Sequence, residues 1–171
     1  MDDDAFRAFH QQTSSGLWAY LVGACRDRAL ADDVLQESYL RLLRATHFVP
    51  ESEEHRRRYL YRIASNLLHD HARSPRRRED SIEDLELAAP PSSSGGDSSG
   101  LKTDLARAFA NLGARDRQLL WLAHVEGYSH EEIAVTAGVK PKSVRVLLFR
   151  ARQKLQLILK DAGLAPAGGE A

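Results

Sequence analysis

The 171-residue sequence has little that could crosslink it, anchor it in a membrane or hold a metal ion. Cys25 is the only cysteine, which excludes an intrachain disulfide and a cysteine-based metal site. No apolar run approaches membrane-spanning length, and the first residues, MDDDAFRAF, are acidic rather than signal-like. These absences predict a cytoplasmic protein with no membrane insertion, no metal ion and no other cofactor.

The chain also lacks a net charge, because 24 basic side chains balance 24 acidic ones. The balance is uneven along the chain. Residues 81–104 carry five acidic side chains and one basic one, whereas residues 105–171 carry ten basic side chains and six acidic ones. Between Lys140 and Lys160 there are seven basic residues and no acidic one. A solvated helix face normally mixes both signs, so this run predicts contact with the phosphates of nucleic acid.

The basic run belongs to a helix-turn-helix pattern, SHEEIAVTAGVKPKSVRVLLFRARQKL, over Ser129 to Leu155. Ser129 and Glu132 make a capping box for the first helix. Gly138 permits the positive φ of a tight turn, and Pro141 suits the first turn of the second helix. The second helix of such a motif enters the major groove of DNA. The residues expected to contact DNA are Lys140, Lys142, Ser143, Arg145, Val146, Arg150 and Lys154.

The N-terminal part of the chain predicts three amphipathic helices. The first is expected to break near Ser14–Gly16, the second covers ALADDVLQESYLRLLRA, and the third covers HRRRYLYRIASNLLHDHAR. The third combines an apolar stripe with basic and aromatic side chains, and aromatic side chains can stack on unpaired bases. This favours single-stranded nucleic acid, although the same side chains can also shield a small core. The candidates are Arg58, Tyr59, Tyr61, Arg62, Asn66 and His69.

These segments predict an all-α protein of two small helical domains. The first domain covers residues 1–80, an acidic and flexible linker 81–100, the second domain 101–160, and a disordered tail 161–171. The stretch AAPPSSSGGDSSG, Ala88–Gly100, is too rich in proline, serine and glycine to bury a core. Two helices that end near Gly113 and Gly127 are expected to support the helix-turn-helix.

Two helical units in this order resemble the sigma-70 family, and specifically its extracytoplasmic-function (ECF) branch, which keeps only regions two and four. ALADDVLQESYLRLLRA resembles the segment that docks on the clamp helices of the polymerase β′ subunit, with Asp33, Gln36 and Glu37 at matching positions. YLYRIASNLLHDHAR resembles the segment that reads and melts the −10 element, with Arg62, Asn66 and Asp70 matching.

The stretch RDRQLLWLAHVEGYSHEEIAVTAGVKPKSVRVLLFRARQKL resembles the region that reads the −35 element. Val146 stands where the family is commonly polar, and a valine can offer a base only an apolar contact, for instance to a thymine methyl. The resemblance implies a non-catalytic initiation factor that binds core RNA polymerase, through its β′ clamp and β flap regions, and promoter DNA. It also implies an anti-sigma partner.

Other classes of protein explain less of the sequence. His69 and His71 flank Asp70 as in some metal hydrolases, but residues two apart on a helix point to nearly opposite sides. No phosphate loop or nucleophile elbow is present, so the sequence does not predict an enzyme. A pure protein-interaction module does not account for the acid-free basic run. An autonomous helix-turn-helix regulator that binds duplex DNA without polymerase remains an alternative. This alternative assigns no function to the basic and aromatic first domain.

Overall fold

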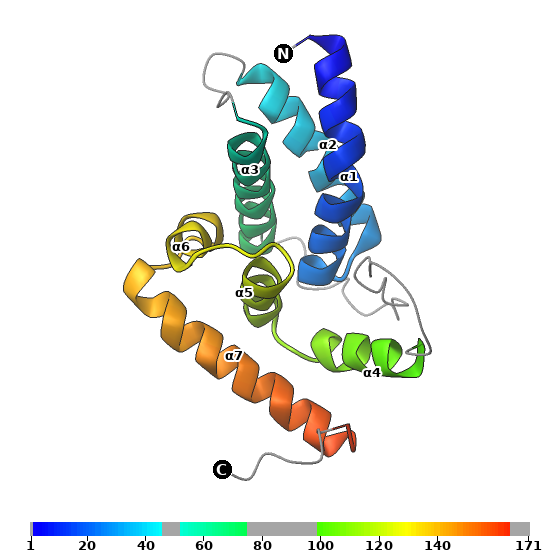
Figure 1. Cartoon of the computed structure of the whole chain (residues 1–171), viewed down its shortest axis with the longest axis vertical. Coiled ribbons are helices and arrows are strands. Elements are labelled where there is room, and N and C mark those ends of the chain that lie inside the picture. Colours follow the sequence, from blue (N-terminus) through cyan, green and yellow to red (C-terminus); the bar gives the residue numbers. More distant parts are fainter. Residues whose placement is uncertain (1, 46–51, 75–98, 165–171) are drawn as a thin grey trace.

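The computed structural model describes residues 2–45, 52–74 and 99–164. Within these ranges every regular element is a helix and no strand is present, which confirms the predicted fold class (Figure 1). The helices are α1 (Asp3–Cys25), α2 (Arg28–Arg44), α3 (Glu53–Arg73), α4 (Ser99–Ala110), α5 (Ala114–His124), α6 (His130–Ala137) and α7 (Pro141–Asp161). None of them is long and apolar enough to cross a bilayer. The predicted linker, residues 81–100, lies outside the described residues up to residue 98, and its last two residues begin α4. The predicted tail, residues 161–171, is described up to residue 164, and Asp161 still belongs to α7.

Helices α1, α2 and α3 pack on one another as an N-terminal bundle. They begin after Asp2, Asp27 and Ser52, whose side chains accept hydrogen bonds from backbone N–H groups of the first turn. The pairwise packing of α1, α2 and α3 buries the apolar stripes that the sequence predicted, and it leaves one side of α3 for the C-terminal helices.

Helix α1 runs without interruption through Ser14–Gly16, so the predicted break is wrong. Phe9, Leu17 and Tyr20 lie on both sides of the weak segment and are buried. Their burial outweighs the poor helix propensity of serine and glycine. Gly16 also serves packing, because a Cβ atom there would lie 3.3 Å from the Tyr61 hydroxyl on α3.

The C-terminal helices are arranged around α5, which packs against α1 on one side and against α6 and α7 on another. This explains why the apolar residues of α5 do not form a single stripe: Leu119, Leu120, Trp121 and Leu122 are all buried. The predicted helix ends near Gly113 and Gly127 are correct, since both glycines lie in turns that flank α5.

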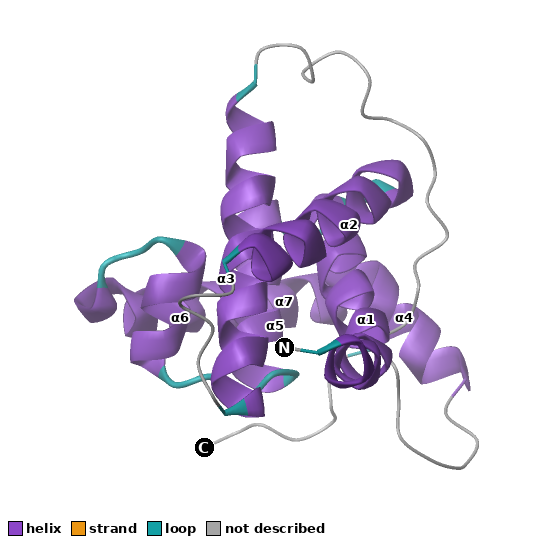
Figure 2. Cartoon of the chain, turned by 90° about the horizontal axis from the view of Figure 1, so that it is seen from above, coloured by secondary structure: helices purple, strands orange, loops and turns teal. Residues whose placement is uncertain are grey.

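The two helical units share one continuous apolar core. Helix α5 packs on α1, and α6 packs alongside α3, as the view from above also shows (Figure 2). Gly23 of α1 permits close contact with α5, because a Cβ atom there would lie 3.4 Å from the ring of Trp121. The sequence predicted two domains but gave no indication that they pack against each other.

Candidate nucleic-acid interface

The helix-turn-helix forms as its local sequence signals predict. Ser129 caps α6 by accepting a hydrogen bond from the Glu132 N–H, and the Glu132 carboxylate accepts one from the Ser129 N–H at 2.8 Å. Gly138 follows α6 with a φ of 67°, a conformation that strongly favours glycine. Pro141 begins α7. Because Ile133, Val144 and Leu148 are fully buried, the opposite side of α7 is left in solvent.

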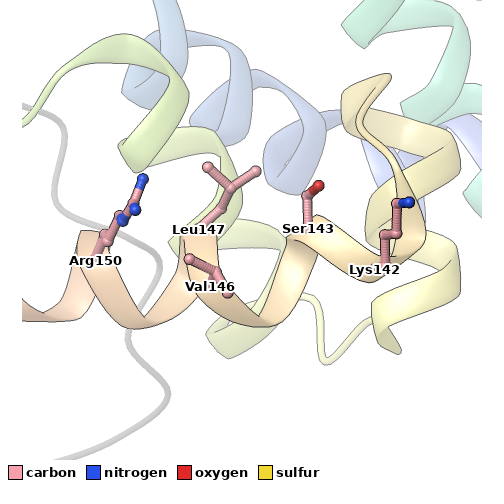
Figure 3. A pocket seen from close by; sticks show the side chains of 5 residues that line it. All are labelled: Lys142, Ser143, Val146, Leu147 and Arg150. Carbon is pink, nitrogen blue, oxygen red and sulfur yellow. The ribbon is translucent and has the colours of Figure 1, made fainter.

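The solvent-facing side of α7 carries most of the predicted duplex contacts. Lys140, Lys142, Arg145, Val146 and Arg150 are exposed, and Val146 is 50% accessible. Lys142, Ser143, Val146, Leu147 and Arg150 line a shallow hollow on this side of the helix (Figure 3). The hollow therefore combines cations with an apolar floor, a combination suited to phosphates at its edge and to a base in its centre.

Lys154 differs from the other predicted phosphate contacts. Its Nζ donates to the Asp116 carboxylate at 2.7 Å, and the Asp116 side chain is 14% exposed. Within the described parts of the chain, no such ion pair ties Lys142, Arg145 or Arg150 to a carboxylate. Lys154 thus brings less uncompensated positive charge to DNA than the cations earlier on α7.

The predicted single-strand contacts on α3 divide into two groups. Arg62, Asn66 and Asp70 follow one another at intervals of four residues and are exposed, so they form one polar row along the helix. Tyr59 is half-buried against the core. The remaining three, Arg58, Tyr61 and His69, face the helix-turn-helix unit and contact it.

Tyr61 is fully buried beneath the C-terminal unit. Its hydroxyl donates to Glu126 Oε1 at 2.8 Å, and its ring lies 5.2 Å from the ring of Tyr20 and 6.1 Å from that of Tyr128. Burial, followed by the neighbouring charge of Glu126, raises the pKa of Tyr61 well above its ordinary value. In this arrangement Tyr61 is closed to nucleic acid.

Glu126 is the acceptor at the centre of this contact. Besides the Tyr61 hydroxyl, its carboxylate accepts hydrogen bonds from Arg57 Nη2 at 2.6 Å and from the Trp121 Nε1–H at 3.3 Å. Only 3% of the Glu126 side chain is exposed. Three donors from two helices therefore compensate one buried negative charge. The sequence shows no pattern that singles out Glu126.

A second polar contact between the units involves α5 and the neighbouring helices. The Gln118 amide donates to the Tyr20 hydroxyl at 2.8 Å, and its oxygen lies 3.2 Å from His69 Nε2. Burial raises the pKa of Tyr20 to about 12, so the hydroxyl stays protonated at neutral pH. Helix α3 is thus bound to the C-terminal unit at both Tyr61 and His69.

The three residues expected to bind polymerase lie on the outer side of α2. Asp33 and Gln36 are exposed, and Glu37 accepts a hydrogen bond from Arg41 Nε at 2.8 Å. That hydrogen bond lowers the pKa of the Glu37 carboxyl. The face is polar and open to a partner, and its role in docking stays a prediction.

The histidine pair of α3 does not form a metal site. His69 faces Gln118 of the C-terminal unit, while Asp70 belongs to the exposed polar row. Across residues 2–45, 52–74 and 99–164, no three histidine, cysteine, aspartate or glutamate side chains group as metal ligands.

The fold and the site define a helical DNA-binding protein whose second unit is a helix-turn-helix. Comparison with known families agrees with this class: the model for Sigma-70 region 2 matches residues 9–78, and that for Sigma-70, region 4 matches residues 102–155. The chain belongs to the sigma-70 family and, by its relatives, to the ECF branch of that family.

Two relatives align over nearly their full length. RNA polymerase sigma factor CarQ of Myxococcus xanthus is 30% identical over 173 residues, which cover 96% of this chain and 94% of CarQ. ECF RNA polymerase sigma factor SigL of Mycobacterium tuberculosis is 28% identical over 161 residues, which cover 92% of this chain and 90% of SigL. The fold is similar to that of the sigma factor RpoE of Bartonella quintana, solved in complex with the anti-sigma factor NepR, with a TM-score of 0.71. That match is 22% identical and covers 91% of this chain and 97% of RpoE.

Proposed function

We propose that this protein is an ECF sigma factor that binds core RNA polymerase and directs it to a set of promoters. The observation that carries the proposal is the presence, on one chain, of the open basic side of α7 and the polar row Arg62, Asn66 and Asp70 on α3. The first suits duplex DNA and the second suits an unpaired strand. A promoter that is being opened presents both.

In the proposed mechanism the protein positions DNA and catalyses no reaction. Helix α7 enters the major groove of the −35 element, where cations contact phosphates and Val146 meets base edges. The exposed row of α3 holds unpaired bases of the −10 element. Asp33, Gln36 and Glu37 dock on the β′ clamp of the polymerase, which performs the chemistry, and the second domain binds the β flap region. The cytoplasm, where polymerase and chromosome meet, is the proposed site of action, and an anti-sigma factor is the proposed regulator.

The alternative, an autonomous helix-turn-helix regulator, differs in one measurable respect. A sigma factor forms a complex with core polymerase and confers start sites on it, whereas an autonomous regulator needs no polymerase to bind its sites. Core polymerase mixed with the full chain and fragmented genomic DNA should yield transcripts with defined 5′ ends, and sequencing those ends would identify the promoters. Failure of the chain to bind core polymerase would contradict the proposal and favour the regulator.

A further inference from the structure

The hollow on α7 is a groove between two rows of side chains. One row consists of Lys142, Val146 and Arg150, which follow one another at intervals of four residues and are all exposed. The other row consists of Ser143 and Leu147, and both rows line the hollow. Figure 3 shows Val146 between the two cations along the helix. An apolar side chain therefore lies at the centre of a surface whose two ends are positively charged.

The spacing of the two cations fits the major groove of DNA. Arg150 follows Lys142 by eight residues, which corresponds to about 12 Å along the helix axis at about 1.5 Å per residue. The major groove of B-form DNA is also about 12 Å wide. The cations can therefore reach phosphates at the edges of the groove, while Val146, midway between them, faces the edges of the bases.

The polar side chains near Val146 do not distinguish one pyrimidine from another. Thymine presents the acceptor O4 in the major groove, whereas cytosine presents the donor N4–H2. A carboxylate would select cytosine by accepting from N4, but the sequence of α7 has no acidic residue before Asp161. The Ser143 hydroxyl, which lines the hollow, can donate to O4 or accept from N4. The hollow therefore does not select a pyrimidine by its hydrogen-bonding edge.

The methyl group at C5 is the part of a pyrimidine that an apolar side chain can select. Thymine carries this methyl and cytosine does not, but 5-methylcytosine carries it at the same position of the ring. Val146 is half-exposed, and Leu147 beside it packs partly against the core. A methyl group that contacts these side chains leaves water, and this gain is the same whichever of the two bases carries it.

The hollow is accessible in the free chain. The buried side of α7 is held by Val144 and Leu148, and the row that contains Val146 lies on the opposite, exposed side. Binding of duplex DNA to this side therefore requires no rearrangement of the other helices.

We propose that the hollow on α7 binds the 5-methyl group of a pyrimidine in duplex DNA, and that 5-methylcytosine fills it as thymine does. The inference rests on the proposed function and names the base chemistry that this site selects. Methylation of one cytosine in a −35 element thus converts a weakly bound promoter into a more strongly bound one. The protein thereby responds to the methylation state of its DNA.

The first test compares cytosine with 5-methylcytosine in duplexes that are otherwise identical. The full chain selects its site from a pool of random duplexes, and each pyrimidine of that site, on either strand, is then replaced by cytosine and by 5-methylcytosine. At one position 5-methylcytosine should bind about fourfold more tightly than cytosine, the effect of burying one methyl. Thymine should match 5-methylcytosine there within about twofold, since Ser143 accommodates either polar edge. If methylation raises the affinity at no position, the inference is wrong.

The second test changes the valine. In V146S the affinities for cytosine and 5-methylcytosine at that position should become equal, whereas V146I keeps an apolar side chain and should keep the preference. The control is F149S, which removes an exposed apolar side chain of α7 that does not line the hollow, and its preference should stay about fourfold. A preference that survives in V146S, or that is lost in F149S, would refute the assignment of the methyl to this hollow.

A third variant separates the phosphate contacts from the methyl contact. K142A should weaken binding to methylated and unmethylated duplexes by the same factor and flatten the dependence of log K on log salt by about 0.9, the loss of one phosphate contact. The ratio of the two affinities should stay as in the unaltered chain. A changed ratio in K142A would contradict the division between cations that bind phosphate and a valine that binds the methyl.

These measurements use the free chain and duplex DNA, so their outcome is independent of polymerase. A chain that binds core polymerase and confers start sites on it but shows no methyl preference would keep the proposed function and refute this inference. A chain that prefers the methylated duplex but never binds core polymerase would refute the proposed function and leave a methylation-sensitive duplex-binding protein.

Discussion

Arg117 of α5 donates a hydrogen bond from Nε to the carbonyl oxygen of Gly23, in the last turn of α1, over 2.7 Å. Its Nη2 donates to the carbonyl of Ala24 at 2.9 Å. Helix α1 has no basic residue of its own in that turn, so a cation from the C-terminal unit supplies the charge that a helix C-terminus favours. Burial, with a smaller effect of Arg26, lowers the pKa of Arg117 to about 10, which leaves it charged at neutral pH.

Replacing Arg117 by methionine should lower the free energy of unfolding by about 3 kcal/mol, because buried carbonyls lose charge-assisted hydrogen bonds. Lysine should restore only part of this stability, since one ammonium group cannot match the planar fork of the guanidinium. Urea unfolding of the full chain measures the effect. Arg115, which is exposed on the same helix, is the control, and equal losses in R115M and R117M would contradict the role assigned to Arg117.

A second prediction compares two cations of α7. Changing Arg150 to alanine should flatten the dependence of log K on log salt for holoenzyme on duplex −35 DNA by about 0.9, the loss of one phosphate contact. The change in K154A should be smaller, because Asp116 already compensates the lysine in the free chain. Identical slopes for the two variants would show that the Lys154–Asp116 pair breaks when DNA binds.

Val146 should make the protein sensitive to a single methyl group of the DNA. At a −35 thymine that it contacts, replacement by deoxyuridine removes only the 5-methyl group and should weaken holoenzyme binding about fourfold, the effect of burying one methyl. In V146S the same replacement should have no effect. Val135, equally exposed but on α6, provides the control variant V135S. If replacing each −35 thymine by deoxyuridine weakens binding of V146S as much as binding of the unaltered protein, Val146 does not contact a thymine methyl.

The outer side of α2 should determine affinity for core polymerase. Replacing Asp33 and Glu37 together by lysine should weaken core binding at least tenfold, because like charges brought together at an interface lower the binding free energy by roughly several kcal/mol. The helical circular dichroism signal should be unchanged, because both side chains lie on the solvent side of the helix. The control variant is E131K/D161K, which changes the net charge equally at exposed positions of α6 and α7. If both variants bind core polymerase alike, these positions are not the docking site.

Local signals account for what the sequence predicted well. The capping box of Ser129 and Glu132, the turn at Gly138 and the start at Pro141 are encoded within a few residues of one another, and all three are confirmed. The predicted break near Gly16 is wrong because burial against distant helices outweighs local propensity. No pattern in the sequence indicates this burial.

The contact between the two units was not predictable in the same way. Tyr61 and Glu126 are 65 residues apart, and Arg117 and Gly23 are 94 apart. Glu126 looks like any surface glutamate in a helix–helix connection, and Tyr61 like any aromatic residue on a basic helix. The roles of Tyr61 and Glu126 depend on how the two units pack against each other. Many residues each contribute weakly to that packing, so the roles are visible only in the folded chain.

The continuous core also has a thermodynamic consequence. Leu17 and Tyr20 in the first unit and Ile133 and Val144 in the second belong to one buried cluster, which also includes Trp121. Neither unit can lose its structure without exposing apolar surface of the other, so their unfolding is coupled. The free chain should absorb heat in a single cooperative transition although its sequence encodes two modules, and each module becomes an independent folding unit only after the two have parted.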